Sequence, residues 1–235
     1  MGWDWEVIIK YFPRLLDGAW LTLELVVISG LIGIAVSIPL ALLRTSSNRW
    51  VKALPYAYIY FFRGTPLLVQ IFLVYYGASQ FDVIRESILW SVLKEPYWCA
   101  IIAFSMNTAA YSAELFRGAI QAIPNGEIEA AESLGMSHSL LTRRIILPRM
   151  FGIALPGYGN EVILMLKGSA LASTITLLDI TGMARTVIAR TYTPLEIFLA
   201  AGVIYLLMSG IIIALFRFME SRFNRYQSYN PDRNA

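Results

Sequence analysis

Stretches of about 20 mostly apolar residues recur along this chain, and their length constrains its fold more than any other feature. At about 1.5 Å per residue, an α-helix of that length crosses the hydrocarbon core of a bilayer. The five stretches are 19–43, 54–76, 97–119, 155–178 and 196–218. Hydrophobic residues make up 57% of the chain and charged residues 15%, which is too apolar for one soluble core of this size. The sequence therefore predicts an all-α membrane protein with five transmembrane helices, spanning residues 19–218.

The distribution of Lys and Arg predicts which side of the membrane each connecting segment faces. Segments on one side of the predicted spans hold eleven of these cations, and segments on the other side hold six. The richer set comprises 44–53, 117–149 and the C-terminal tail; the other set comprises the N-terminus, 77–96 and 179–195. Basic residues are retained on the cytoplasmic side. We therefore expect an external N-terminal segment (1–18), a cytoplasmic loop (120–150) and a cytoplasmic tail (219–235).

The residues that the chain lacks exclude several kinds of chemistry. Its only cysteine is Cys99 and its only histidine is His138, so an intrachain disulfide and a histidine-rich zinc site are excluded. No lysine precedes Ser or Thr, so the phosphate-binding pattern GxxxxGK[ST] of many ATPases is absent. The basic residues are scattered over loops, which argues against nucleic-acid binding. We expect no catalytic residue, no metal site and no cofactor in this chain.

The cytoplasmic loop 120–150 is polar and too long to be an idle connection between packed helices. Its sequence predicts two short helices. Asn125 can cap the first helix and Gly135 can end it. Ser137 can cap the second, which Pro148 is expected to stop. Such a helix pair beneath a membrane bundle docks a soluble partner or serves only as a structural loop, and the local pattern leaves both readings open.

The same loop resembles a known family signature. Glu129, Ala130 and Ala131 are followed by Gly135 and, after nine residues, by Ile145-Ile146-Leu147-Pro148. This series resembles the EAA motif of ABC-importer permeases in full. The resemblance implies the type I ABC-importer permease fold. It also implies that Glu129, Ala130, Ala131, Gly135, Leu147 and Pro148 couple to a separate ATP-hydrolysing subunit, which binds the ATP and Mg²⁺.

Three further segments resemble the polar amino-acid branch of these permeases. They are Arg63-Gly64-Thr65-Pro66 with Gln70, Asn107-Thr108-Ala109-Ala110-Tyr111 with Glu114, and Asn160-Glu161-Val162-Ile163 with Lys167 and Ser169. The resemblance covers nearly the whole chain. It is closest to the membrane subunits of importers for histidine, lysine, arginine and ornithine, and for octopine and nopaline. One departure is the Gly-Ser-Ala-Leu run after Lys167, where relatives often have a sequence like Thr-Ser-Leu.

Charged residues inside a predicted span are costly and are therefore candidates for function. The four candidates are Arg63, Glu114, Glu161 and Lys167. Each can instead be half of a buried ion pair that fixes helix register. Helical spacing places Asn107, Tyr111 and Glu114 on one face of the third span, and Asn160 and Lys167 on one face of the fourth. The predicted substrate pathway comprises Arg63, Thr65, Asn107, Tyr111, Glu114, Asn160, Glu161 and Lys167.

An amino-acid zwitterion in this pathway needs a cation at one end and a carboxylate at the other. Arg63, beside the Gly64 and Pro66 irregularity, suits the substrate carboxylate. Glu161 is the first choice for the cationic end, and Glu114 is the second. Carboxylates in the pathway favour basic over acidic substrates.

These features predict a permease subunit of an ATP-driven importer for basic amino acids or opines, in the bacterial inner membrane. The expected partners are a second permease copy or sibling, two ATP-binding subunits and a periplasmic amino-acid-binding protein. The alternative is a secondary transporter or channel driven by an ion gradient, whose intramembrane acids would bind protons or sodium. The EAA loop separates the two, because a secondary transporter has no ATPase to dock.

Overall fold

The computed structural model describes residues 4–223, and within that range the chain is helical, with turns and no β-strand. The α-helices are α1 (Trp5–Thr45), α2 (Arg49–Gly64), α3 (Leu67–Phe72), α4 (Asp82–Arg85), α5 (Trp90–Leu93), α6 (Pro96–Gln121), α7 (Asn125–Ser133), α8 (His138–Leu141), α9 (Leu147–Gly168), α10 (Ile180–Thr191) and α11 (Pro194–Phe223). Two π-helical segments, Leu73–Gly77 and Thr142–Ile146, and two 3₁₀ segments, Ala78–Gln80 and Ser169–Ile175, complete the list.

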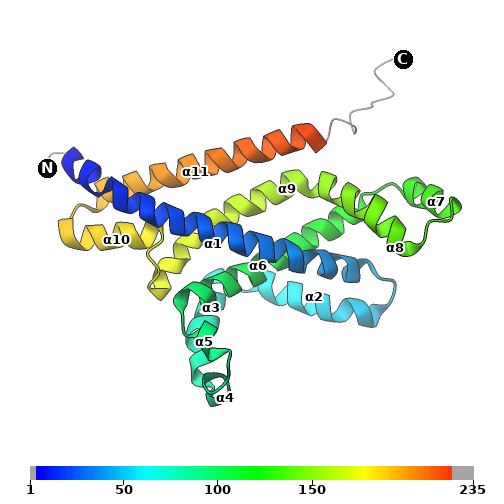
Figure 1. The fold of residues 1–235 in the computed structure, drawn as a ribbon, viewed down its shortest axis with the longest axis horizontal. Helices are drawn as coiled ribbons and strands as arrows, with labels where there is room; N and C mark the ends of the chain where they lie inside the picture. Colours follow the sequence, from blue (N-terminus) through cyan, green and yellow to red (C-terminus); the bar gives the residue numbers. More distant parts are fainter. Residues whose placement is uncertain (1–3, 224–235) are drawn as a thin grey trace.

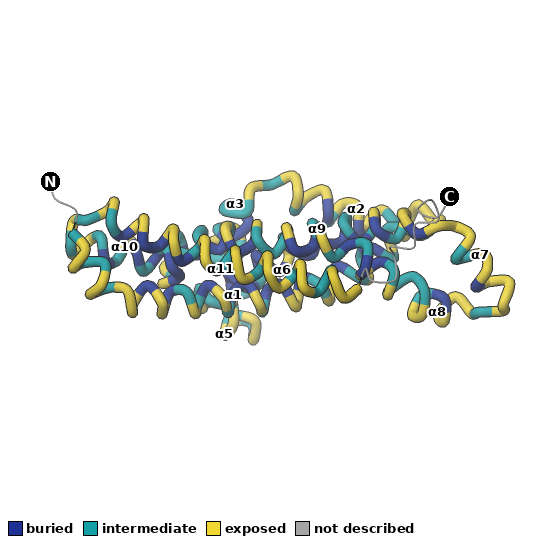
Figure 2. Tube along the Cα trace, turned by 90° about the horizontal axis from the view of Figure 1, so that it is seen from above, coloured by how far each residue is buried: buried dark blue, intermediate teal, exposed yellow. Residues whose placement is uncertain are grey.

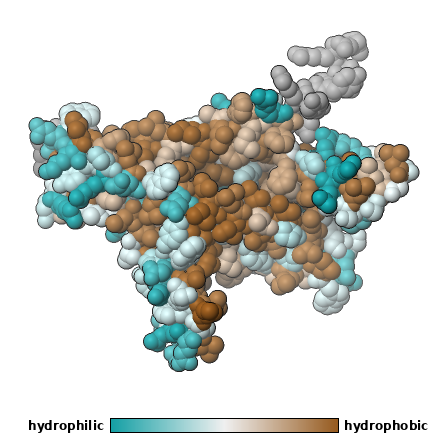
Figure 3. Space-filling model, viewed as in Figure 1, coloured by the Kyte–Doolittle hydropathy of each residue, from teal (hydrophilic) through white to brown (hydrophobic). Residues whose placement is uncertain are grey.

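Four long helices, α1, α6, α9 and α11, make an elongated bundle (Figure 1). The bundle has α10 beside the N-terminal half of α1, and α2 packs against α1 and α6. Viewed from above, α7 and α8 lie at one end and α10 lies at the other (Figure 2). Apolar residues cover the middle of the bundle, with hydrophilic residues gathered toward both ends (Figure 3). This banded surface fits a bundle whose middle lies in lipid.

Two helices, α1 and α11, are each long and apolar enough to cross a membrane. Two bent pairs also qualify when each pair is taken as one span: α2 with Leu67–Gln80, bent by 107°, and His138–Ile175 with α10, bent by 49°. Helix α6, the predicted third span, is 26 residues long but falls short of the same apolarity. Its polar residues, Glu114 and Arg117 among them, are the reason.

The first helix begins much earlier than the predicted first span. Helix α1 starts at Trp5, and the Asp4 side chain caps it by accepting hydrogen bonds from the backbone N–H groups of Glu6 and Val7. Most of the predicted external segment 1–18 is therefore helix, continuous with the span. Residues 224–235 of the predicted tail lie outside the described residues.

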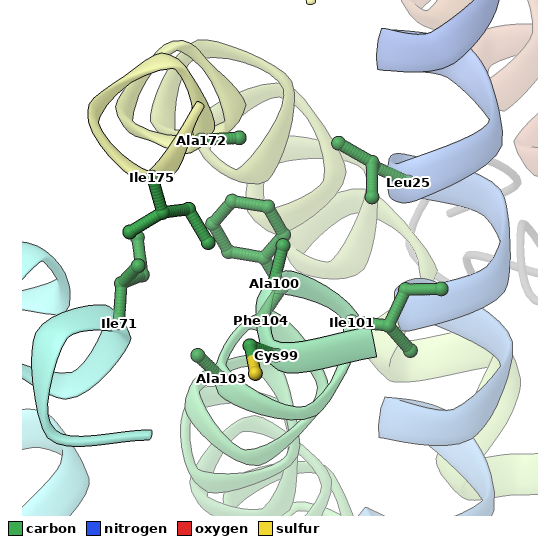
Figure 4. Packing of buried hydrophobic residues seen from close by; sticks show 9 residues of the cluster. All are labelled: Leu25, Ile71, Cys99, Ala100, Ile101, Ala103, Phe104, Ala172 and Ile175. Carbon is green, nitrogen blue, oxygen red and sulfur yellow. The ribbon is translucent and has the colours of Figure 1, made fainter. Parts of the chain in front are cut away.

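A buried cluster at the centre holds α3 and the 3₁₀ segment after α9 against α6 and α1. Phe104 of α6 lies among Ile71, Ile175 and Leu25 (Figure 4). Helices α1 and α6 approach closely because α1 presents small residues there. A Cβ on Gly33 would lie 2.9 Å from the Thr108 side chain, and the Ser29 hydroxyl donates to the Ile101 carbonyl at 3.4 Å.

Candidate functional site

A partly polar cavity of about 270 Å³ lies where the α2–α3 break meets α6 and α9. We call it the central cavity. Its lining residues are Thr65, Pro66, Leu67, Phe104, Asn107, Thr108, Tyr111, Glu161, Leu164 and Met165. Four of the eight predicted pathway residues, Thr65, Asn107, Tyr111 and Glu161, are thus brought together from three parts of the chain.

The cavity wall at the α2–α3 break is held by Gln70, which is 2% exposed. Its side-chain amide donates to the carbonyls of Phe62 and Thr65 at 2.8 and 3.0 Å. These are backbone acceptors that the 107° bend leaves without helical partners. The Gln70 side-chain oxygen accepts from the Asn107 amide at 2.9 Å. Gln70 therefore fixes both the break and its position against α6.

Glu161 is a half-buried carboxylate that makes no hydrogen bond or ion pair with any described residue. Arg63 acts on it electrostatically, but the Arg63 guanidinium lies over the Tyr111 ring, 5.3 Å from the ring centroid. Among residues 4–223, no ion pair involves Glu161, so the alternative that it fixes helix register through such a pair is not supported. A half-buried carboxylate without a partner in a cavity can accept a cationic ligand group.

Glu114, by contrast, lies outside the central cavity and has partners. It accepts a hydrogen bond from Arg117 Nε at 2.9 Å and pairs with one terminal nitrogen of that guanidinium. Its second oxygen lies 3.9 Å from the Arg44 guanidinium. Glu114 and Arg63 both line a smaller neighbouring cavity of about 160 Å³, which we call the inner cavity.

The other two predicted pathway residues, Asn160 and Lys167, are exposed and do not line the central cavity. They share a face of α9, as their spacing predicts. Lys167 forms no ion pair with the described residues. A lone lysine near the end of α9 needs a covering partner or water if that face lies at membrane depth.

The segment between α6 and α9 forms two short helices, α7 and α8, and α7 carries Glu129, Ala130 and Ala131. Helix α7 ends at Ser133, and two residues later Gly135 has φ +75. The Gly135 N–H donates to the Glu132 carbonyl at 2.9 Å, and the Met136 N–H donates to the Ala131 carbonyl at 3.1 Å. This pair of bonds is the Schellman ending that a left-handed glycine permits. The Ser137 hydroxyl caps α8 through the Leu140 N–H.

Two local predictions for this loop are wrong. Asn125 does not cap α7; it is the first helical residue, and Pro124 occupies the cap position with no side-chain hydrogen bond. Pro148 does not stop the second helix, which continues into α9. A wider π-helical turn over Thr142–Ile146 precedes the proline and accommodates its ring and its missing N–H.

An ion pair ties α7 to the start of α9. Arg149 Nε donates to one Glu127 oxygen at 2.8 Å, and a terminal nitrogen of the same guanidinium pairs with the other oxygen. Glu129 and Ala130 of the EAA-like series are exposed, whereas Ala131 is buried. Helix α7 therefore exposes Glu129 and Ala130, while the Glu127–Arg149 ion pair fixes its orientation against α9.

Sequence reasoning missed two polar sites within the bundle. Glu24 of α1, a charged residue inside the first span, accepts a hydrogen bond from the Tyr97 hydroxyl at 2.7 Å. Asp179 is fully buried, caps α10 and accepts from the Tyr205 hydroxyl at 3.3 Å. A count of acids along the first span would have found Glu24. Asp179 has only a capping signal, because its burial depends on α1 and α11.

Comparison with known proteins identifies the group to which this arrangement belongs. The family model described as "Binding-protein-dependent transport system inner membrane component" matches residues 33–225. The chain belongs to this family. The permease is therefore a transport subunit rather than an enzyme.

Relatives across the whole length narrow the group. The permease is 51% identical over 213 residues to the nopaline transport system permease protein of Agrobacterium fabrum, covering 90% of this chain and 88% of that protein. It is 40% identical over 225 residues to the histidine/lysine/arginine/ornithine transport system permease protein of Escherichia coli K12, covering 92% and 94%. A crystal structure of an amino acid ABC transporter with histidines has a TM-score of 0.82 at 35% identity, covering 94% of this chain and 100% of that chain. The type I ABC-importer permease fold is thereby confirmed.

Proposed function

We propose that this permease forms part of the translocation pathway for basic amino acids or opines in an ATP-driven importer. The observation that carries the proposal is Glu161, a carboxylate in the central cavity that pairs with no described residue and on which Arg63 acts electrostatically. Glu161 binds the cationic end of the substrate, and Arg63 stands where it can attract the carboxylate end. The relatives transport arginine, histidine, lysine, ornithine or nopaline by their names, which supports the same substrate class.

The remaining pathway residues have different roles in this proposal. Thr65, Asn107 and Tyr111 shape the central cavity and present polar groups to the substrate. Asn160 and Lys167 lie on an exposed face of α9 that a second permease subunit covers. The second subunit is a homologous sibling or another copy, related by a pseudo-two-fold axis. Glu114 acts from the inner cavity rather than at the first binding position.

In the complete importer, this chain crosses the bacterial inner membrane five times, with its N-terminus outside and its C-terminus in the cytoplasm. Two cytoplasmic subunits bind ATP and Mg²⁺, and α7 docks into them through Glu129, Ala130 and the Gly135 turn. Leu147 and Pro148 begin α9 directly after this loop, so a movement of the loop is transmitted along α9 to the central cavity. A periplasmic binding protein delivers the substrate. The proposed cytoplasmic segments hold eleven Lys and Arg and the external segments six, and this bias supports the orientation.

Uptake by reconstituted vesicles tests the proposal against a gradient-driven transporter. Vesicles containing the permease, its sibling and its ATPase should accumulate labelled arginine only with internal ATP and external binding protein. Dissipating the proton and sodium gradients should leave that uptake unchanged. Uptake that persists without ATP and stops with an ionophore would contradict the proposal.

A further inference from the structure

We infer that the inner cavity is a second substrate position, where Arg44 binds the carboxylate of the amino acid after it leaves the central cavity. The inference rests on the proposed import function. The lining residues are Arg44, Tyr56, Ile59, Tyr60, Arg63 and Glu114. At about 160 Å³ the cavity is large enough for a carboxylate and the atoms next to it.

The charges around this cavity do not balance. Three arginines, Arg44, Arg63 and Arg117, surround one carboxylate, Glu114. Arg117 satisfies the first Glu114 oxygen. The second oxygen is buried without a hydrogen bond, and so is Arg44 Nε. Glu161, in the central cavity, acts on Arg63, so three arginines face two carboxylates and one positive charge is in excess. An excess positive charge next to a cavity is the condition under which a protein recruits an anion.

Arg44 forms an ion pair with Glu114 but no hydrogen bond to it, so its N–H groups remain available to a ligand carboxylate. Its side chain is 17% exposed, and its guanidinium lies 4.9 Å from the Tyr56 ring centroid. Its separation from Glu114 is 3.9 Å, beyond hydrogen-bond distance. Stacking on an aromatic ring fixes the guanidinium plane and leaves its N–H groups directed sideways. A planar, preorganised guanidinium suits a carboxylate.

The inner cavity follows the central cavity along the direction of import. Asn107, Tyr111 and Glu114 occupy one face of α6, so Glu114 lies about 10 Å further along the helix than Asn107. Arg63 lines the inner cavity and stacks on Tyr111, which lines the central cavity. The Arg63 and Tyr111 side chains therefore separate the inner cavity from the central cavity. Arg44 lies at the end of α1, where Leu42 and Thr45 face the coupling loop.

Cysteine protection tests the assignment in vesicles containing the complete importer without nucleotide. In a Cys99→Ser background, Tyr60→Cys places a thiol at the open edge of the inner cavity. Leu54→Cys places one at an exposed position of the same helix that does not line the cavity. A thiol reagent is added with arginine or with agmatine, which lacks the carboxylate. At about ten times the arginine concentration that gives half protection, labelling of Tyr60→Cys should fall about tenfold. Leu54→Cys should label equally throughout, and agmatine should not protect.

Variants of Arg44 then identify the binding group. Arg44→Gln should abolish protection by arginine, and Arg44→Lys should retain part of it. Equal protection by agmatine and arginine, or protection unchanged in Arg44→Gln, would overturn the assignment. Labelling that follows phosphatidylglycerol content instead of arginine would assign the anion to a lipid headgroup and overturn it as well. Vesicles that import arginine but show no protection would refute the inner position while leaving the proposed function intact.

Discussion

The Asn107 side-chain amide donates a hydrogen bond to the Gln70 side-chain oxygen at 2.9 Å, and this contact joins α6 to the break between α2 and α3. Gln70 is almost fully buried and also donates to two backbone carbonyls of the break. A sharp bend within a span leaves backbone acceptors without helical donors, and a buried side-chain amide is a compact way to satisfy them. The shape of the central cavity therefore depends on one glutamine.

Gln70→Leu should destabilise the permease without changing its substrate preference. Each buried polar group left unsatisfied costs about 1–3 kcal/mol. The thermal midpoint of the purified complex should fall, and uptake of arginine, histidine and glutamine should decrease by the same factor. Gln80→Leu is the matched control, because Gln80 is exposed and bonds only within its own turn. An unchanged thermal midpoint in Gln70→Leu would show that Gln70 does not stabilise the α2–α3 break.

Gly135→Val should uncouple transport while the protein still inserts in the membrane. A β-branched residue in the left-handed region costs about 1–2 kcal/mol, so the turn after α7 is lost. No atom lies within 4 Å of a Cβ built on Gly135, so the defect would be backbone strain and not a clash. Gly135→Asn should therefore retain much of the activity, because asparagine tolerates this conformation. The readout is ATPase-coupled uptake at matched expression.

Gly118→Ala is the control for that substitution. Gly118 is helical, has negative φ and also has open space around its Cβ. Alanine there should be neutral or slightly stabilising. Equal losses from Gly135→Val and Gly135→Asn would instead point to a direct contact with the ATPase.

Charge reversal at Glu127 and Arg149 should weaken coupling singly and restore it together. The side chains of the two residues are 36% and 34% exposed, so the pair contributes about 0.5–1 kcal/mol to holding α7. Glu127→Arg or Arg149→Glu alone should lower the stimulation of ATP hydrolysis by the binding protein. Combining both should recover most of it. Losses that simply add in the double variant would show that the two side chains act independently.

Glu161→Gln should reduce transport of arginine-like substrates more than that of neutral ones. A charge-assisted hydrogen bond contributes about 1.5–3 kcal/mol, which corresponds to about a ten- to hundredfold loss. Stability should be preserved, because Glu161 makes no hydrogen bond or ion pair with the described residues. Uptake of arginine, histidine and glutamine by wild type and variant measures the selectivity.

Glu24→Gln is the comparison for Glu161, since Glu24 is a carboxylate of the bundle that contacts Tyr97 and does not line the central cavity. Any loss there should be equal for all substrates. Equal losses in Glu161→Gln, together with a lower thermal midpoint, would make Glu161 a structural residue.

Cysteine labelling should place the coupling loop and the α4–α5 segment on opposite sides of the membrane. In the Cys99→Ser background, which removes a fully buried thiol, Ser139→Cys should react only from the cytoplasmic side. Ser91→Cys of α5 should react only from outside. Positions 4 and 230 extend the test, with position 4 external and position 230 cytoplasmic. Labelling in the reverse pattern would invert the proposed topology.

The ends of the coupling helix show how far local sequence reaches. Gly135 and Ser137 act as predicted, because a left-handed glycine and a serine cap need only their own neighbouring N–H groups. The prediction that Pro148 stops the second helix is wrong, because a π-helical turn accommodates the proline within a helix that continues beyond it. A local pattern cannot show what the next element does.

By itself, the sequence determined the apolar runs, the coupling motif and the face of α6 that holds Asn107, Tyr111 and Glu114. Each of these depends on residue spacing along one helix or on run length. Only the tertiary structure decided which charges have partners. Glu114 and Glu161 read alike in sequence, yet Glu114 pairs with Arg117 and Arg44, while Glu161 makes no ion pair with any residue in 4–223. Helical spacing specifies the face on which a side chain lies, but its partner depends on how the helices pack against one another.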